Sequence, residues 1–245
     1  MDTQIKYDRQ KMKKHNFLKT LLLAAVSLFI NQRISAQSST LNFGIKAGVN
    51  LSNATVNDAT GTNIKPGYHI GGTIEYPVSK QFLIQSGLIF SNKGSKIHQL
   101  NASGYIPQPP DDTHTFNQSY LVLPIYGAYK LHVKKDFNIV FGAGPYLGYA
   151  IGGRTTQKLN KGSWSEGVTE VSWDTFGDGI FDETRDWLRG TTLKRLDIGI
   201  GANVNFEYRQ FILGIGYEQG LRNIADKDNR QNLNYKNNSF QFSIA

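Results

Sequence analysis

The chain lacks cysteine entirely, and this absence excludes several kinds of site. Without thiols it has no disulfides, no thiolate metal centre, no cysteine nucleophile and no lipid-modified cysteine anchor. After residue 36 it also has no apolar run approaching the ~20 residues that a transmembrane helix needs, and no long stretch with a helical period. The composition is nevertheless that of a folded protein, because 39% of the residues are hydrophobic and 12% are aromatic.

An excess of basic residues gives a formal net charge of +8, but much of it is concentrated at the start of the chain. Residues 1–36 contain seven basic and two acidic residues, so the remaining 20 basic and 17 acidic residues give only +3. A binding surface for nucleic acid requires a concentrated basic charge on the folded domain. We therefore expect no nucleic-acid partner.

Residues 1–36 have the pattern of a secretory signal peptide. Four lysines come before the apolar stretch 21–30, and Ile34-Ser35-Ala36 offers a small residue for cleavage. The lysines are Lys11, Lys13, Lys14 and Lys19. The apolar stretch is too short to cross a bilayer as a helix. The pattern predicts an exported domain at 37–245, and the alternative is an N-terminal anchor helix.

The rest of the chain shows the period-two alternation of β-strands with two unlike faces. In 41–51 apolar residues alternate with small or polar ones, and 196–208 repeats the pattern. Each predicted strand is near or above the ~9–11 residues of a tilted membrane-spanning strand. The predicted strands are 41–51, 67–78, 81–92, 118–132, 136–152, 192–208, 210–222 and 237–245.

Short and long connections alternate between these strands. The short ones are 79–80, 133–135 and 209, and the long ones are 52–66, 93–117, 153–191 and 223–236. Short periplasmic turns and long external loops are typical of outer-membrane barrels. The sequence therefore predicts an all-β fold, an eight-stranded antiparallel up-and-down transmembrane barrel in the outer membrane of a Gram-negative bacterium.

The two faces of the strands predict a lipid-facing wall and a filled lumen. Aromatic residues near the strand ends are typical of an interfacial girdle. These residues are Phe43, Tyr76, Phe82, Tyr129, Phe137, Tyr208 and Phe211. The opposite face carries many glycines and a network of charges that can pair inside the barrel. The charged residues are Lys46, His69, Glu75, Lys130, Arg195, Asp197, Glu207, Glu218 and Arg222. Pro124 and Pro145 fall inside strands, so we expect a bulge or a strand shift near each.

Several segments, in this order, carry a resemblance to the PorT-type outer-membrane β-barrel family. They are Phe43–Ser52, Tyr120–Lys130, Gly142–Gly148, Leu196–Ala202 and Gly216–Ile224. The resemblance covers nearly all of 40–245 and implies an OmpA-like barrel in the outer membrane. It also implies a link to protein secretion, because some members of that family have one.

The histidines give no support for an enzyme. Of the four that follow the leader, only His69 and His132 lie in predicted strands, and neither has a serine at a His-x-Ser spacing. For His69 we expect a pairing in the lumen with a carboxylate such as Glu75.

The connection 153–191 contains the other candidate site. Asp174, Asp178 and Asp182 stand at relative positions one, five and nine, with Gly179 at position six, which is similar to a calcium loop. Phe176 occupies position three, where a carboxylate is missing, and the alternative is a solvated acidic loop. The same connection holds all three tryptophans, Trp164, Trp173 and Trp187, which can anchor a partner or pack against the barrel rim.

Together these patterns predict a monomeric, non-enzymatic barrel with a structural or interaction role through its outer loops. Its partners would be outer-membrane lipid, the outer-membrane assembly machinery and a protein bound at the long loops. No cofactor is expected apart from calcium at the acidic segment. Two other functions stay open at this point, a narrow porin-like channel for small solutes and a secreted lipocalin-like barrel with its apolar face turned inward round a ligand.

Overall fold

The structure is a computed structural model, and it describes residues 41–57, 59–100, 113–158, 170–177, 192–226 and 234–245. The chain divides into two units, Met1–Ser38 and Ser39–Ala245. The first unit lies outside the described residues, so the signal peptide at 1–36 stays a prediction. Within the described ranges, no helix has the length and apolar character needed to cross a membrane.

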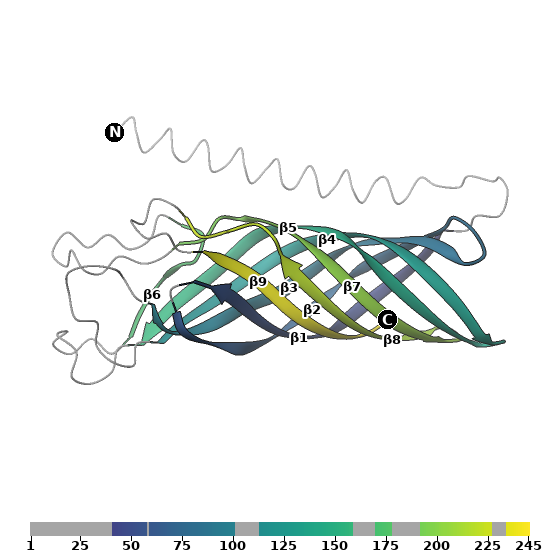
Figure 1. Cartoon of the computed structure of the whole chain (residues 1–245), viewed down its shortest axis with the longest axis horizontal. Helices are drawn as coiled ribbons and strands as arrows, with labels where there is room; N and C mark the ends of the chain where they lie inside the picture. Colours follow the sequence, from purple (N-terminus) through teal and green to yellow (C-terminus); the bar gives the residue numbers. More distant parts are fainter. Residues whose placement is uncertain (1–40, 58, 101–112, 159–169, 178–191, 227–233) are drawn as a thin grey trace, which may run out of the picture. The chain divides into compact units, whose positions relative to one another are not determined.

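The described strands form one antiparallel sheet that closes into a barrel (Figure 1). Its wall consists of eight long strands in the order β1-β2-β3-β4-β5-β7-β8-β9, with β9 paired to β1. These are β1 (Asn42–Val56), β2 (Ala59–Pro77), β3 (Phe82–Leu100), β4 (Thr113–Lys134), β5 (Phe137–Lys158), β7 (Leu196–Tyr208), β8 (Phe211–Gly220) and β9 (Tyr235–Ile244). The predicted all-β, eight-stranded up-and-down barrel is confirmed.

The two ends of the barrel differ. The turns β2–β3, β4–β5 and β7–β8 are only a few residues long and lie together at one end, which we call the short-turn end. The other end, the long-loop end, also carries β6 (Glu170–Asp174), which among the described strands pairs only with the last residues of β5. The wall is therefore extended at the long-loop end by a local sheet of β4, β5 and β6.

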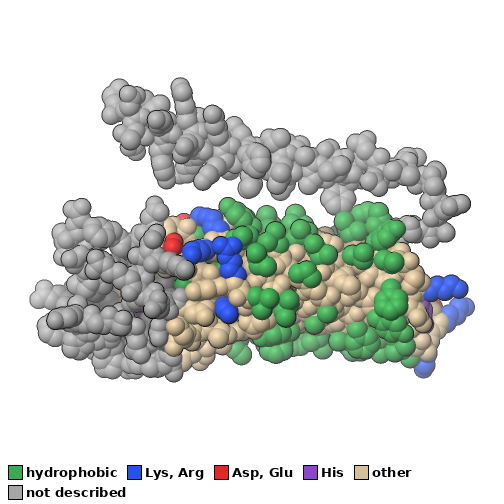
Figure 2. All heavy atoms as spheres, turned by 45° about the horizontal axis from the view of Figure 1, so that its top comes forward, with side chains coloured by type: hydrophobic (Ala, Val, Ile, Leu, Met, Phe, Trp, Pro, Cys, Tyr) green, Lys and Arg blue, Asp and Glu red, His purple; other side chains and the backbone are tan. Residues whose placement is uncertain are grey.

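Apolar side chains point outward over most of the wall, and small or polar ones point inward. In β7, Ile198 and Ile200 are exposed, whereas Asp197 and Gly199 are buried. Exposed hydrophobic side chains from all eight wall strands form a belt around the barrel (Figure 2). A lipocalin-like barrel holds its apolar face inside, so this alternative is wrong.

Six of the wall strands are longer at the long-loop end than the alternation predicts, whereas β7 and β8 are shorter there, beginning at Leu196 and ending at Gly220. β3 runs to Leu100 and β4 begins at Thr113, so most of the predicted loop 93–117 is strand. The predicted loops 52–66, 153–191 and 223–236 likewise lose residues to β1, β2, β5, β6 and β9. Beyond the belt the alternation changes its sense, because Ile97 and Phe116 point inward and are fully buried. The outward positions there are polar, so the apolar-outward pattern ends before the strands do.

The two prolines within strands produce neither a bulge nor a strand shift, contrary to the prediction. The register of β4 continues unchanged on both sides of Pro124, and the register between β4 and β5 continues past Pro145. Pairing is interrupted for two residues on one side of each proline, at Leu123 and Pro124 toward β3 and at Gly144 and Pro145 toward β4, because proline has no N–H to donate. The register shifts among the described strands lie elsewhere, between Ser119 and Tyr120 and between His132 and Lys134 in β4, and between Ile64 and His69 in β2.

Inward-facing glycines make room for aromatic side chains inside the barrel. A Cβ added at Gly201 would collide with the hydroxyl of Tyr126, and one added at Gly199 would collide with the ring of Tyr146. Gly127 on the outer wall has open space around it instead. The glycines of the inner face therefore allow tyrosine rings to cross a lumen that is only eight strands wide.

Candidate functional site

The lumen is filled by an apolar cluster toward the long-loop end. Its large side chains come from different parts of the wall. The ring centroid of Phe116 in β4 lies 5.3 Å from that of Tyr235 in β9. Tyr120 lies edge-on to Phe176 at 5.8 Å between ring centroids. These four side chains are almost completely buried. The cluster closes the lumen at this level with packed rings.

A buried ion cluster of Lys93, Asp197 and Glu218 lies next to these rings. Lys93 Nζ is 3.4 Å from Glu218 Oε2 and 3.6 Å from Asp197 Oδ2, and the lysine side chain is only 1% exposed. Lys93 belongs to β3 and Glu218 to β8, which are opposite each other in the order of the eight wall strands. The ion pair therefore spans the barrel from wall to wall.

Other groups complete the surroundings of this ion cluster. Lys93 Nζ lies 5.0 Å from the ring centroid of Tyr120 and 5.0 Å from that of Tyr146, at cation–π distance. The amide of Asn237 donates to Asp197 Oδ2 at 3.0 Å, and the hydroxyl of Tyr146 donates to the same oxygen at 3.4 Å. Each of these partners is on a different strand from Lys93, so the ammonium group ties β3 to β4, β5, β7 and β8.

Lys93 is the functional residue that sequence reasoning missed. Asp197 and Glu218 are in the predicted network, but Lys93 falls in the predicted loop 93–117. The signal was present, since Lys93 is in phase with Ile89 and Ser91, which also point inward. Continuing the period-two pattern past the end of the apolar belt would have placed it on the inner face.

Neutral hydrogen bonds between inward-facing side chains join β1, β2 and β3 on the short-turn side of the ion cluster. The ring nitrogen Nδ1 of His69 lies 2.7 Å from Oδ1 of Asn50, and the amide of Asn50 donates to Ser91 at 3.0 Å. His69 therefore has an amide partner, and the predicted pairing with a carboxylate such as Glu75 is wrong. Glu75 instead accepts a bond of 2.8 Å from the amide of Gln85.

Nearer the long-loop end, a second set of neutral bonds centres on the hydroxyl of Tyr235. It accepts a bond of 2.8 Å from the amide of Gln118 and lies 2.7 Å from the hydroxyl of Ser95. The three residues are buried and belong to β9, β4 and β3. They add a further connection between separate strands of the wall.

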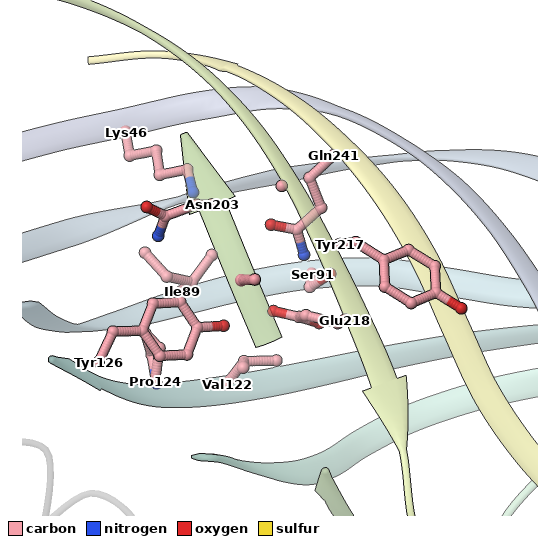
Figure 3. Close-up of a pocket in the computed structure, with 12 residues that line it drawn as sticks. Lys46, Ile89, Ser91, Val122, Pro124, Tyr126, Asn203, Tyr217, Glu218 and Gln241 are labelled. Carbon is pink, nitrogen blue, oxygen red and sulfur yellow. The ribbon is translucent and has the colours of Figure 1, made fainter. Parts of the chain in front are cut away.

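The short-turn half of the lumen is polar and contains two small adjoining cavities. Figure 3 shows one of them, with Lys46, Tyr126, Asn203 and Glu218 around it. The cavities have volumes of about 30 and 70 Å³ and share Lys46, Tyr126 and Asn203 in their walls. A water needs ~10–15 Å³ on this measure, so they hold a few waters at most.

The remaining charges of the predicted network lie in several places. Lys130 and Glu207 form an ion pair of 2.8 Å near the short-turn end. Arg195 lies at the long-loop rim, where it donates to the carbonyl of Ala150 at 3.2 Å and its guanidinium covers the ring of Phe176 at 5.6 Å. Arg222 is exposed just after β8 ends, so its assignment to the lumen is wrong.

The predicted calcium loop and the tryptophans are described only in part. Asp174 ends β6, and its Oδ1 accepts a bond of 2.8 Å from the backbone N–H of Phe176. Asp178 and Asp182 lie outside the described residues, so calcium binding stays a prediction. Trp173 is buried against His114, at 6.2 Å between ring centroids, and therefore packs against the rim. Trp164 and Trp187 also lie outside the described residues.

The aromatic side chains of the predicted girdle lie on the outer wall near the short-turn end. Most of them are exposed, whereas Phe137 is half-buried. The rings of Phe82 and Tyr129 are in edge-on contact at 5.3 Å between centroids. Exposed aromatic rings beside the turns suit the boundary between hydrocarbon and lipid headgroups.

A barrel with an apolar exterior and a filled interior is the architecture of an outer-membrane protein, and the family that the chain matches has the same architecture. The family described as "Outer membrane protein beta-barrel domain" matches residues 33–226, most of the chain. The chain belongs to this family. Membership indicates an integral protein of the Gram-negative outer membrane. The finer assignment to the PorT type rests on the sequence resemblance alone.

Solved structures with a similar fold share little sequence with this family member. Ail, the attachment invasion locus protein of Yersinia pestis, is 11% identical, with a TM-score of 0.37 over 82% of this chain and 95% of Ail. Neisserial surface protein A is 10% identical, with a TM-score of 0.36 over 84% of this chain and 97% of its own. OprG from Pseudomonas aeruginosa is 11% identical, with a TM-score of 0.45 over 84% of this chain and 95% of OprG. No curated protein matches the chain.

Proposed function

We propose that this outer-membrane barrel is non-conducting and non-enzymatic, and that it acts through its long-loop end, which faces the cell exterior. The observation that carries the proposal is the ion cluster, in which Lys93 meets Glu218 from the opposite side of the barrel at 3.4 Å. The rings of Tyr120 and Tyr146 pack against the same ammonium group. A solute would have to break this buried cluster to pass.

A narrow channel is the second candidate, and the polar cavities of the short-turn half favour it. Their combined walls reach from Ala245 at the short-turn end to Glu218 of the ion cluster. Beyond that level the apolar cluster fills the lumen toward the long-loop end. The cavities therefore support a water-filled recess with one closed end better than they support a path across the membrane.

Electrical conductance in planar bilayers separates the two candidates. We expect the purified barrel to give no stable conductance steps, because an eight-stranded lumen filled with side chains has no aqueous path. An open porin measured in the same membrane is the control for detection. Stable steps that persist at several salt concentrations would establish the channel and contradict the plug.

The proposed orientation puts the short turns in the periplasm, as in outer-membrane barrels generally. Trypsin added to intact cells is expected to cut in 159–169 or 178–191, after Lys161, Arg185 or Arg189. Lys134 and Lys135 in the β4–β5 turn should be cut only after the cells are broken. Cleavage of that turn in intact cells, with both long segments spared, would invert the topology.

The side chains around the histidines support a role without catalysis. Nδ1 of His69 faces an amide, and the ring of His114 packs among Phe116 and Trp173. A catalytic triad needs a nucleophile, a histidine and an acid in one chain of hydrogen bonds. In this proposal the chain is an exported monomer whose leader is removed. The link to protein secretion that the PorT resemblance implies would then operate through a protein bound at the long-loop end.

A further inference from the structure

Cations gather on the outer wall where the apolar belt ends at the long-loop end. Figure 2 shows Lys and Arg side chains along this edge of the belt. Four of them belong to neighbouring parts of the wall, and we call them the basic arc. The basic arc consists of Arg154 in β5, Lys194 before β7, Arg222 after β8 and Lys236 in β9.

The basic arc lies just beyond the last exposed apolar residues of the same strands. Arg154 follows Ile151 by three residues, and Lys236 precedes Phe240 by four. Arg222 comes directly after Leu221, which is 54% exposed. With ~3.3 Å per residue, the cations start within about 3–13 Å of the belt along their strands. This is the level at which the headgroups of lipids packed against the belt must lie.

The charge of the arc is only partly balanced by nearby acids. Asp174 faces Arg154 in the register of β5 and β6, and Asp226 lies near Lys194, where its N–H donates to the carbonyl of Thr192. Within the described part of the chain, no salt bridge joins a cation of the arc to a carboxylate. Among the described residues, these two acids stand against the four cations of the arc, which leaves this part of the wall positive.

Among the described residues, the other side of the barrel carries no such arc at this level. The outward positions beyond the belt are neutral in β1 and β4, where Asn53, Thr55 and Asn117 stand. Lys96 in β3 is exposed there, and the cation close to it on the neighbouring strand β2, Lys65, has a buried side chain. The positive charge is therefore concentrated over β5, β7, β8 and β9, which is what recognition of one bound anionic molecule requires.

We propose that the basic arc binds the phosphate groups of a phosphorylated glycolipid in the outer leaflet. Arginine and lysine are the usual protein partners of phosphate, and arginine binds it with two parallel hydrogen bonds. A lipid is favoured over a soluble anion because the arc and the belt share one wall. Acyl chains against Ile198 and Phe240 would bring a headgroup phosphate to the level of the cations.

This inference rests on the proposed orientation of the barrel in the membrane. The experiment that tests it is carried out in micelles and does not depend on that orientation. The barrel folded in neutral detergent micelles is titrated with diphosphoryl lipid A, and binding is followed by native mass spectrometry. The test variant carries Arg154→Gln, Lys194→Gln, Arg222→Gln and Lys236→Gln. The matched control removes as many cations at the short-turn end, with Lys80→Gln, Lys134→Gln, Lys135→Gln and Arg209→Gln.

We expect the test variant to bind lipid A at least about tenfold more weakly than the control variant, because each cation near a lipid surface contributes ~1 kcal/mol. Six of the eight substituted side chains are exposed, Lys194 and Lys236 are half-buried, and heat-modifiable migration in gels verifies that both variants are folded. Equal losses in the two variants would overturn the proposal, since net charge alone would then explain the binding.

Two further arms identify the source of the phosphate. Phosphatidylglycerol should bind more weakly than lipid A and should not distinguish the two variants. Soluble glucosamine phosphate should fail to compete with lipid A, and competition at matched phosphate concentration would overturn the assignment to a lipid. Trypsin cleavage of intact cells addresses the orientation separately, so an inverted topology would contradict the proposed function while leaving the binding in micelles unchanged.

Discussion

Lys93→Met is expected to destabilise the barrel by about 3–5 kcal/mol, the usual cost of removing one partner from a buried ion pair. The substitution leaves the carboxylates of Asp197 and Glu218 facing each other in a site where both are almost completely buried. It also removes the cation that contacts the rings of Tyr120 and Tyr146. Urea unfolding in detergent micelles, followed by the fluorescence of the three tryptophans, measures the loss.

A matched control is available on the same strand. Lys96 is three residues further along β3 and its side chain is exposed on the outer wall. Lys96→Met is expected to change the free energy of unfolding by less than ~0.5 kcal/mol, as surface substitutions usually do. Equal stability of the two variants would mean that the lumen charges are solvated and that the ion cluster does not seal the barrel.

Neutralising the partners distinguishes charge from packing. The triple variant Lys93→Met, Asp197→Asn, Glu218→Gln removes the unpaired carboxylates as well as the lysine. Because replacement of a whole buried ion pair by neutral groups is often close to neutral in stability, we expect it to recover most of the loss. If the triple variant stays as unstable as Lys93→Met, the lysine contributes through its shape and not through its charge.

The wall of the barrel was predictable from sequence because hydrocarbon imposes a simple rule on it. Wherever a strand lies in the belt, each second residue must be apolar, as Ile198 and Ile200 are in β7. The period-two pattern therefore located all eight wall strands and the face of each. It located the short turns as well, because they interrupt the alternation for only two to four residues.

The filling of the lumen was predictable only in part. The residue types of the inner face, with many glycines and mixed charges, indicated a plug, but a strand pattern does not specify which strands face each other across a barrel. Nor does it specify the register of neighbouring strands, which brings His69 in β2 to Asn50 in β1, 19 residues away. The partner of Glu218 is 125 residues away on the opposite strand. Such pairs depend on the closure and stagger of the barrel.

The long-loop end was the least predictable region, for a different physical reason. There the strands leave the hydrocarbon, and the apolar residues turn inward, as Ile97 and Trp173 do. A pattern defined by apolar residues on the outside ends at this point even though hydrogen bonding between β4, β5 and β6 continues. The same reversal hid Lys93 in a predicted loop and made the connection 153–191 seem longer than it is.

Arginine substitutions on the two faces of β7 are expected to have opposite consequences for folding. Ile200→Arg places a cation in hydrocarbon, since Ile200 is 52% exposed in the middle of the apolar belt. Near the bilayer midplane this costs about 2–4 kcal/mol. Leu123→Arg in β4, which is exposed on the same wall, should behave in the same way. The folded fraction in lipid vesicles, read from heat-modifiable migration in gels, measures both.

Asn203→Arg is the matched substitution on the inner face of the same strand. Asn203 lines both polar cavities, and Glu218 lines one of them and Glu75 the other. A guanidinium there meets carboxylates and amide groups in place of acyl chains, so we expect a smaller loss of folded protein than at Ile200. The nearby Lys46 repels the new positive charge, and this repulsion accounts for the loss of folded protein that we still expect.

The comparison also separates a membrane wall from a water-facing one. If the exterior faced water, Ile200→Arg would be harmless, and crowding in the cavities would make Asn203→Arg the more damaging change. If the exterior faces hydrocarbon, the order is reversed, and the penalty at Ile200 should shrink for arginines moved toward the ends of the belt, where charges reach the headgroups. Equal losses at Ile200 and Asn203 would contradict the assignment of outer and inner faces on which the plug, the girdle and the basic arc all depend.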